Sequence, residues 1–431
     1  MIAMSKRQQI LMVVGAYYPE VSGGGLQCRT LIRALSERVT FTVLTTTTLA
    51  AGQVRDLIDD VPVYRLYVDP QNPWTKFRTL FQLLRLAPEL RRRCQIIHFH
   101  GFTQKMIFLR ALARILRVPV IQKMTSLGYD DPLSIRRRQG ALAYRIFASA
   151  SRFVSVSPAL SDRYTTSGLS PSRLAFVPNG VDVNRFHPVE SCEKTRLRNE
   201  HRLPADAHIV TFVGFWSLEK GPELLVDAWL TAVRATRRSS FLLFLGASST
   251  PHLEVDPIYV RRLRERLDYE ASGCYKIVEQ THAVAEHLQS SDIFVLPSVR
   301  EGLPNALLEA MAVGLACVAV DIPGVTGWIL RDSDNGFLVH PGDVATLQRV
   351  LVRLLTDEDL RRMVGERARS TVVQRFSTQM LAEAYFDLYT SLTSSSLPLP
   401  DAFAARKEDG HFPAGIYDTV LDEWDAAHPR H

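Results

Sequence analysis

Two glutamates, Glu301 and Glu309, stand eight residues apart around the start of a helical pattern in the segment REGLPNALLEAM. The segment follows SSDIFVLPS, an apolar run typical of a buried strand. Pro304 suits the first position of a helix, and Asn305 and Glu309 then share a face that points away from the core. The apolar face consists of Leu303, Ala306, Leu307, Ala310, Met311 and Gly314. Because the first turn and the dipole of a helix attract anions, this pattern predicts a phosphate site between two carboxylates.

A lysine stands at a second junction between a strand and a helix, in TFVGFWSLEKGPELLVDAW. The pattern predicts a helix that begins at Pro222, with Lys220 near its N-terminus and at the end of a strand. A lysine in this position can hold a diphosphate and offset the charge on a leaving group. A solvated lysine at a helix start is the alternative interpretation.

Three consecutive glycines, Gly23, Gly24 and Gly25, follow the first apolar run in YYPEVSGGGLQCRT. They allow a turn with positive φ, in which backbone N–H groups approach a phosphate or a sugar closely. Their spacing is not G-x-G-x-x-G, so the dinucleotide fingerprint is absent. The alternative is a simple connecting turn between strand and helix that binds no ligand.

His98 and His100 lie two residues apart at the end of the run QIIHFH and therefore on one side of a strand. No third ligand has the spacing of a zinc site, so His100 is expected to line a cleft and His98 to be packed. The acidic pair of the sequence DSD, Asp332 and Asp334, is expected in a turn rather than around a metal. We expect no metal and no cofactor.

The composition is that of a globular protein, with 46% hydrophobic and 22% charged residues in 431. This length indicates about two or three domains. No apolar run approaches the roughly 20 residues of a membrane helix, and ILMVV is expected to be a first strand rather than a signal peptide. Five cysteines without metal spacing favour a reducing cytoplasm.

The net charge of +6 is unevenly distributed, since residues 1–180 carry +15 and the remainder −9. Basic clusters occur at Arg91–Arg93, at Arg136–Arg138 and in LRALARILR. They suggest an anionic membrane surface, an anionic substrate or a nucleic acid, and the alternative is a solvated helix face. Because no nucleic-acid motif accompanies the charge, nucleic acid is the least favoured partner. Peripheral attachment to the inner face of a membrane is therefore a hypothesis.

Short β-branched runs alternate with helical patterns along the chain, which predicts the α/β class with parallel sheets. The strand-like runs are QILMVVG, VTFTVLT, VPVYRLY, QIIHFH, VPVIQKM, RFVSVS and RLAFVP, then HIVTFVGF, SFLLFLG, CYKIVEQ, DIFVLPS, ACVAV and GFLVHP. Two such series predict two doubly wound, Rossmann-like domains. The expected boundaries are 1–195 for the first domain with the linker and 196–375 for the second. Residues 376–395 are expected to form a helix that returns to the first domain, and 396–431 a partly disordered tail.

Several of these segments together resemble a known family. REGLPNALLEAMAVG resembles the E-x7-E motif of retaining GT-B glycosyltransferases that use nucleotide sugars. VPNGVDVNRFHP is similar to the linker signature of that family, VGFWSLEKGPELLVDAW to its strand–KG–helix segment, and SGGG to its N-terminal glycine loop. The matches run in the order of the family from about residue 10 to about residue 390. The resemblance implies the GT-B fold, in which two Rossmann-like domains face each other across a cleft.

The resemblance also implies roles for individual residues. Glu301 would contact the hydroxyls of the transferred sugar, Lys220 would bind the diphosphate, and Glu309 would hold the ribose. Backbone amides would seat the diphosphate, at Gly302, Leu303, Asn305 and Ala306. The glycine loop, with Gly24 and Gly25, would line the sugar and phosphate pocket from the first domain.

The chain departs from the family pattern at three places, one of which is the loop DIPGVTGWI, which lacks the glutamate that many relatives have beyond it. Phe215 stands where many relatives have an arginine, so that Arg300, Arg29 or another cation would have to replace it. TSLGYDD stands where relatives often have a histidine–glycine pair, so that Ser126, Asp130 or Asp131 would supply the cleft residue.

The resemblance thus implies a metal-independent, retaining transferase for a glycan or lipid-linked acceptor in surface polysaccharide or glycolipid biosynthesis. The alternatives are a non-catalytic nucleotide-sugar-binding or scaffold protein, and a sugar-nucleotide epimerase or phosphorylase of the same fold. The sequence does not identify the donor sugar, the acceptor or the oligomeric state.

Overall fold

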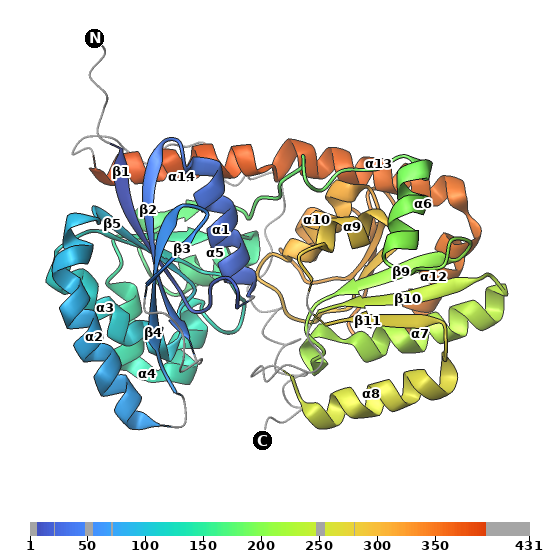
Figure 1. Ribbon diagram of the computed structural model, residues 1–431, viewed down its shortest axis with the longest axis horizontal. Helices are drawn as coiled ribbons and strands as arrows, with labels where there is room; N and C mark the ends of the chain where they lie inside the picture. The colour runs from blue at the N-terminus through green and yellow to red at the C-terminus, as the bar shows by residue number, and fades with distance from the viewer. Residues whose placement is uncertain are drawn as a thin grey trace, which may run out of the picture. The chain divides into compact units, whose positions relative to one another are not determined.

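The computed structural model describes residues 7–20, 22–47, 55–69, 72–246, 255–279 and 281–393. The chain forms two compact units, Met1–Gly180 with Thr378–His431, and Val181–Ser377 (Figure 1). Residues 181–195, which were assigned to the first domain from the sequence, thus lie in the second unit. The return to the first unit begins at Thr378, and the tail 396–431 lies outside the described residues.

The first unit contains an eight-stranded sheet in the order β3-β4-β2-β1-β5-β6-β7-β8. All neighbours are parallel except the pair of β3 and β4. Its strands are β1 (Gln8–Val14), β2 (Val39–Thr47), β3 (Arg55–Ile58), β4 (Val61–Tyr67), β5 (Ile96–His100), β6 (Val120–Lys123), β7 (Arg152–Ser155) and β8 (Leu174–Phe176).

Helices cover both faces of this sheet. The helices α2, α3, α4 and α5 contact one another in that order, whereas α1 contacts α14. Right-handed crossovers place these two groups on opposite faces. The helices are α1 (Gly23–Leu35), α2 (Pro73–Arg92), α3 (Gln104–Leu116), α4 (Pro132–Ala148), α5 (Pro158–Thr166) and α14 (Thr378–Thr393), with a 3-10 turn η1 (Pro171–Arg173).

The second unit contains a six-stranded parallel sheet in the order β11-β10-β9-β12-β13-β14. This is the order of a classical Rossmann sheet. Its strands are β9 (His208–Val213), β10 (Ser240–Leu245), β11 (Tyr275–Val278), β12 (Ile293–Leu296), β13 (Ala316–Val320) and β14 (Phe337–Val339).

Two groups of helices enclose the second sheet. The helix α7 contacts α8 and α12, and α10 contacts α9 and α13. In Figure 1, α7 and α8 lie below the strands of this unit, and α9 and α10 lie above them. The helices are α6 (Ser191–Glu200), α7 (Pro222–Thr236), α8 (Pro257–Glu270), α9 (Val284–Gln289), α10 (Asn305–Val313), α11 (Thr326–Ile329), α12 (Val344–Thr356) and α13 (Glu358–Arg375), with a 3-10 turn η2 (Leu218–Lys220).

The C-terminal helix α14 completes the core of the first unit. Six of its side chains pack with residues of β1, α1 and β2 in one buried cluster, namely Leu381, Ala382, Ala384, Tyr385, Leu388 and Tyr389. The Tyr389 hydroxyl also lies 2.8 Å from Nδ1 of His98 on β5. A segment far from residues 1–180 in sequence is therefore part of their hydrophobic core.

The α/β class with two doubly wound sheets is confirmed, and every strand-like run of the sequence forms a strand. The strand β3 was missed because its sequence, RDLI, is short and charged and lies at the exposed edge of the sheet. Among the described helices, none is long and apolar enough to cross a membrane.

Candidate functional site

The residues with the strongest chemical pattern follow β9 and β12, which are neighbours in the second sheet. After β9 the chain turns to one side of the sheet, toward β10, and after β12 it turns to the other, toward β13. Ligands of open parallel sheets bind at such a switch point, beyond the carboxyl ends of the strands. The topology thus brings Lys220, after β9, close to Glu301, after β12.

Two ion pairs connect these two loops. Lys220 Nζ lies 2.7 Å from Glu301 Oε1, and Arg300 Nη1 lies 3.2 Å from Glu219 Oε1. The Val299 N–H also donates to the Glu219 carbonyl at 2.9 Å. Glu219 and Lys220 of one loop thus pair with Arg300 and Glu301 of the other. The structure therefore brings together Lys220 and Glu301, which are two of the predicted site residues.

Glycine at position 221 allows the two loops to approach. Gly221 has φ 63° and precedes α7, which begins at Pro222 as predicted. A Cβ at Gly221 would lie 2.8 Å from the Pro297 carbonyl oxygen in the other loop. Ser217 accepts a hydrogen bond from the Lys220 N–H and thereby holds the turn that carries the lysine.

The helix α10 begins one residue later than predicted. Pro304 has an extended backbone (ψ 110°) and is the N-cap, whose carbonyl accepts from the Leu308 N–H at 3.3 Å. Gly314 has φ 84° and ends the helix rather than contributing to its buried face. Gly302 and Leu303 are buried in the loop before the helix, and Asn305 and Ala306 form its half-buried first turn. The amides of this turn point out of the N-terminus, where the helix dipole favours an anion.

Glu309 lies one turn further along α10 and is partly buried. Burial raises the pKa of this carboxyl to about 7, and the positive charge of Arg185 opposes the rise. Arg185 itself donates to the His282 carbonyl at 2.8 Å. No sequence pattern indicated Arg185, because it lies in the polar segment before α6.

The glycine loop of the first unit does not form the positive-φ turn that three glycines allow. Gly23, Gly24 and Gly25 form the first turn of α1, and none of them has a positive φ. Ser22 caps the helix and accepts from the Gly25 N–H at 3.0 Å. A Cβ at Gly25 would lie 2.4 Å from the Ala16 carbonyl oxygen, whereas one at Gly24 would meet no atom within 4 Å. Close backbone packing, not a left-handed turn, therefore requires a glycine at position 25.

His100 ends β5 beside the end of β1, since it pairs with Val14 in the sheet. It is only 3% exposed, and neither of its ring nitrogens has a hydrogen-bond partner among the described residues. Burial, together with the neighbouring His98 and Lys123, lowers its pKa well below the ordinary value. His98 is packed against Tyr385 and Tyr389, as expected.

The structure adds a buried lysine that the sequence analysis passed over. Lys123 ends β6, is 2% exposed and donates to Asn179 Oδ1 at 2.9 Å. Burial lowers its pKa to about 8. No carboxylate of the described residues forms an ion pair with it. A lysine within the apolar run VPVIQKM was a detectable signal, because such a run predicts a buried strand, where lysine is rare.

Ser126 and Asp130 lie in the loop after β6. The Asp130 carboxylate accepts from the Thr125 and Ser126 N–H groups and from the Thr125 hydroxyl, at 2.7 to 3.0 Å. Burial raises the pKa of this carboxyl to about 6. Asp131 caps α4 through the Ser134 N–H and pairs with Arg163 at 2.8 Å. The two aspartates thus hold the loop and the start of α4, and Ser126 is half-buried at the strand end.

Both arginines considered as replacements for the family arginine are ion-paired. Arg300 is 2% exposed and faces Glu219. Arg29 binds Asp59 through two contacts of 2.7 and 3.0 Å, in the first unit. Arg300 stands at the switch point, but its pairing leaves Lys220 as the more exposed cation there.

Asp332 and Asp334 lie in a turn, as expected. Asp332 accepts from the Leu338 N–H at 2.9 Å, and Asp334 pairs with Arg331 and Arg367 at 2.8 Å each. Among the described residues, no group of three or more His, Cys, Asp or Glu side chains could hold a metal ion.

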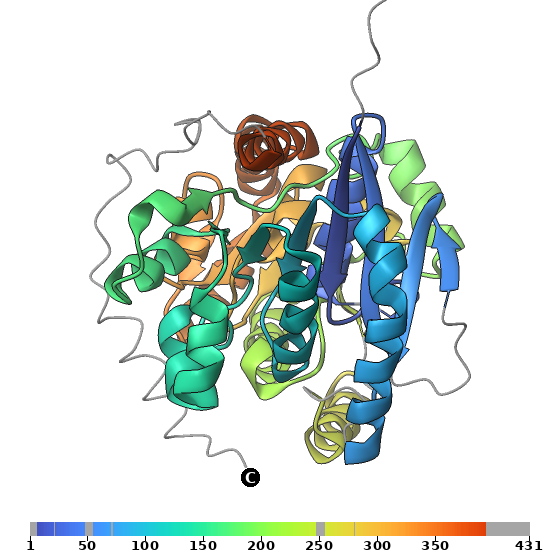
Figure 2. The ribbon, with the colours of Figure 1, turned by 90° about the vertical axis from the view of Figure 1, so that its left-hand side faces the viewer.

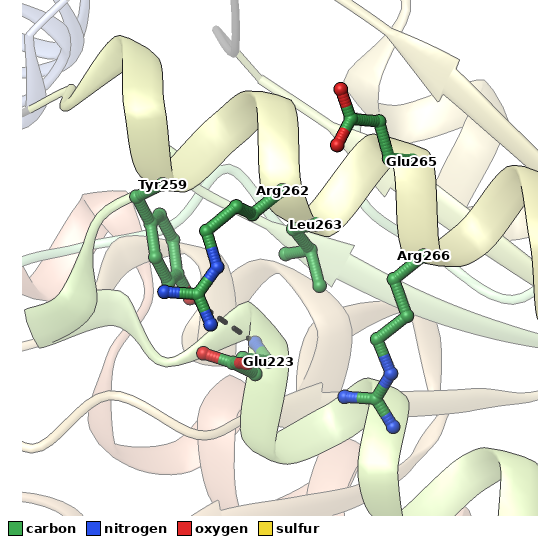
Figure 3. A pocket seen from close by; sticks show the side chains of 6 residues that line it. All are labelled: Glu223, Tyr259, Arg262, Leu263, Glu265 and Arg266. Atoms are coloured by element: carbon green, nitrogen blue, oxygen red, sulfur yellow. Dashed lines mark hydrogen bonds between the residues drawn. The ribbon is translucent and has the colours of Figure 1, made fainter.

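A cavity of about 220 Å³ lies elsewhere in the second unit, between α8 and the start of α7 (Figure 3). Its lining residues are Glu223, Tyr259, Arg262, Leu263, Glu265 and Arg266. Tyr259 and Arg262 point from α8 toward Glu223, whose N–H lies 3.4 Å from the Tyr259 hydroxyl. None of the predicted site residues lines this cavity.

The switch point of the second unit thus combines a cation, a helix N-terminus and two carboxylates. These groups can bind a diphosphate and the hydroxyls of a sugar or a ribose. Together with the two Rossmann-like sheets, they define the class of two-domain enzymes that act on nucleotide-linked sugars.

Comparison with protein families identifies the class. Residues 193–371 match the model "Glycosyl transferases group 1", and residues 22–180 match the model "Glycosyl transferase 4-like domain". The chain belongs to the group 1 glycosyltransferases.

Curated relatives are similar to this chain over part of their length. EpsD of Bacillus subtilis (strain 168) is 32% identical over 213 residues, or 49% of this chain and 53% of that protein. Alpha-maltose-1-phosphate synthase of Mycolicibacterium smegmatis is 30% identical over 57% of this chain and 64% of that protein. The chain therefore spans between half and two thirds of these two relatives. UDP-Gal:alpha-D-GlcNAc-diphosphoundecaprenol alpha-1,3-galactosyltransferase of Escherichia coli is 24% identical over 79% of this chain and 87% of that protein.

Solved structures share the fold at low sequence identity. HepE of Anabaena, in complex with UDP and glucose, has a TM-score of 0.74 at 16% identity and covers 90% of this chain and 100% of that one. WaaG, a glycosyltransferase involved in lipopolysaccharide biosynthesis, has a TM-score of 0.67 at 15% identity, with 89% and 100% covered. The fold is thus GT-B.

Proposed function

We propose that the protein transfers a sugar from a nucleoside-diphosphate sugar to an alcohol of a glycan or lipid-linked acceptor, with retention at the anomeric carbon. The observation that carries the proposal is the short Lys220–Glu301 ion pair at the switch point of the second unit. Lys220 supplies the cation that a diphosphate needs, and Glu301 the carboxylate that binds sugar hydroxyls.

In the proposed reaction, the bond between the anomeric carbon and the diphosphate oxygen breaks, and its electron pair leaves with the diphosphate. The acceptor hydroxyl attacks the same face of the sugar and forms the new glycosidic bond. Its proton passes to the departing phosphate oxygen. Lys220 and the first-turn amides of α10 stabilise the charge that develops on the diphosphate, so we propose that the transfer requires no metal.

Glu309 is proposed to accept hydrogen bonds from the ribose hydroxyls. The support for this role is that Glu309 lies one turn along α10 from the proposed diphosphate site, since the ribose follows the diphosphate in a nucleoside diphosphate. Burial raises its pKa to about 7, so hydrogen bonds from the ribose would favour the ionised form.

The acceptor class is proposed from relatives. The Escherichia coli relative is named for a diphosphoundecaprenol acceptor, and others are named for lipopolysaccharide core and capsular polysaccharide biosynthesis. A lipid-linked or surface glycan acceptor would bring the enzyme to the cytoplasmic face of a membrane.

The test is binding of UDP, GDP and ADP and their common sugars, followed by thermal unfolding of the wild type, Glu309→Ala and a control, Glu265→Ala. The proposal expects one nucleotide to stabilise the wild type and the control and to lose its effect in Glu309→Ala. With that donor and a glycan alcohol, NMR of the product should show the anomeric configuration of the donor.

Two other outcomes would replace the proposal. Nucleotide binding without turnover on any acceptor would favour a binding or scaffold protein. Conversion of the donor without an alcohol acceptor would favour an epimerase, and a sugar phosphate as product would favour a phosphorylase.

A further inference from the structure

The helix α2 of the first unit has an exposed face that combines apolar and basic side chains. Trp74, Phe81 and Leu84 are 78%, 55% and 48% exposed. With 100° per residue, they share one side of the helix with the exposed Arg78 and Arg85. The opposite side holds the buried residues of α2, namely Thr75, Thr79, Leu83, Leu86, Ala87 and Leu90.

The arginines of this face have no acidic partner among the described residues. No described carboxylate forms an ion pair with Arg78, Arg85 or Arg92. The Arg85 guanidinium lies 4.5 Å from the centre of the Phe81 ring, so the basic and aromatic side chains are in direct contact. Glu89, on the same helix, is engaged by Arg55 at 2.6 Å.

The basic character extends over α3, which lies beside α2, and over α4, which lies beside α3 (Figure 2). Between Pro73 and Ala148 the chain has fifteen lysines and arginines and three acidic residues. Of the acidic residues, Asp130 and Asp131 are buried. Arg136, Arg137 and Arg138 are exposed on α4, where Leu142 is 73% exposed. This side of the unit is therefore cationic with protruding apolar side chains.

We propose that the α2 face, defined by Trp74, Arg78, Phe81, Leu84 and Arg85, docks on an anionic lipid bilayer, with α3 and α4 adding charge. An amphipathic helix in the interface inserts aromatic and leucine side chains at the boundary of headgroups and acyl chains, and its basic residues bind the headgroup phosphates. A nucleic acid would use the arginines but would leave Leu84 and Phe81 without a role. The helix is about 30 Å long, enough to lie along the surface over several headgroups.

The test is flotation of the full chain with vesicles of phosphatidylcholine, with and without phosphatidylglycerol. The proposal expects binding to the anionic vesicles alone and release by high salt, because bound charges are screened. Arg78→Gln with Arg85→Gln should lower the partition coefficient by roughly thirtyfold, and Phe81→Ser with Leu84→Ser by roughly tenfold. A matched pair on α8, Arg261→Gln with Tyr269→Ser, should change nothing, although Tyr269 is 91% exposed.

A second readout locates the contact. Trp74 fluorescence should shift to shorter wavelength with anionic vesicles and be quenched by brominated acyl chains, and Trp74→Phe should remove both effects. All altered side chains are exposed, so thermal unfolding should confirm that each variant is folded.

Three results would overturn the proposal. They are equal binding to neutral and anionic vesicles, an equal loss in the α8 pair, and binding of duplex DNA or RNA without binding of vesicles. Vesicle binding is measured without any sugar donor, so the result of this test does not depend on whether the proposed transferase activity is correct.

Discussion

Lys220 and Glu301 form an ion pair that contributes little to folding, because both side chains are partly exposed. Substitution of Lys220 is therefore expected to lower the turnover rate rather than the stability of the fold. Lys194 and Asp292 form a comparable pair of 2.6 Å in the same unit, away from the switch point. The chain thus offers a matched pair of lysines.

Lys220→Ala is expected to lower kcat by about a hundredfold to a thousandfold, because one preorganised cation at the leaving group is lost. Lys194→Ala should leave kcat unchanged while it lowers the melting temperature slightly. Steady-state kinetics and thermal unfolding of both variants check this. An equal loss of kcat in the two variants would contradict the role given to Lys220.

The buried Lys123 is expected to destabilise the fold at neutral pH. Burial lowers its pKa from 10.5 to about 8, so the folded state binds the proton more weakly than the unfolded state does. The full destabilisation of the fold is present below pH 8 and disappears as the pH rises toward 10.5. Lys123→Met should therefore increase the free energy of unfolding by about 2 kcal/mol at pH 7, after loss of the bond to Asn179, and the difference should shrink at higher pH.

Urea unfolding of the wild type and Lys123→Met at pH 7 and above pH 9 measures this difference. A variant that is less stable at both pH values would show that the Lys123–Asn179 hydrogen bond outweighs the burial of the charge.

At the level of single helices, the first turn of α1 depends on close backbone packing. Gly25 and Gly24 occupy successive positions in the first turn of α1, yet only Gly25 faces the Ala16 carbonyl. Glycine is needed there for space and not for its φ. Adjacent positions should therefore respond differently to the same substitution.

Gly25→Ala should lower the free energy of unfolding by about 2 kcal/mol, since its Cβ would overlap backbone that cannot move freely. Gly24→Ala should be neutral or stabilise by up to about 1 kcal/mol, because alanine favours the helix. Urea denaturation of both variants checks the pair. Equal effects would show that α1 can shift away from Ala16.

The periodicity of the sequence predicted the parallel strands and the helices between them, though not the edge strand β3. Each buried parallel strand is a continuous apolar run, and each surface helix has an apolar stripe. The alternation of the two elements then predicted two doubly wound sheets, whereas the strand order, and with it the approach of Lys220 to Glu301, comes from the structure. The pairing of Glu219 with Arg300 was not predictable, since it depends on which loop crosses over Gly221. The positive φ that Gly23–Gly25 would allow is not used, because Ser22 caps a helix that starts earlier than the apolar pattern.

On the scale of the whole molecule, the first unit is discontinuous in sequence. Residues 1–180 require α14 to cover β1 and α1, and Tyr385 and Tyr389 are completely buried in that core. The second unit, in contrast, is formed by one continuous segment, Val181–Ser377.

Removal of residues 378–431 should therefore destabilise the first unit and leave the second folded. Hydrogen exchange should lose protection in β1 and β5 and retain it in β9 and β12, because α14 packs on the first sheet. A peptide of residues 378–393 added in trans should restore part of the protection. Unchanged protection of β1 in the truncated chain would contradict the assignment of α14 to that core.

The interruption of the first unit has a consequence for synthesis on the ribosome. The segment that emerges first cannot finish folding until α14 has been translated, whereas the later segment has all its contacts as soon as Ser377 is free. The nascent first unit thus waits with an apolar surface exposed while about 200 further residues are made. During that interval it is a target for chaperones, and a pause or stop late in the message would release a chain whose first unit is incomplete.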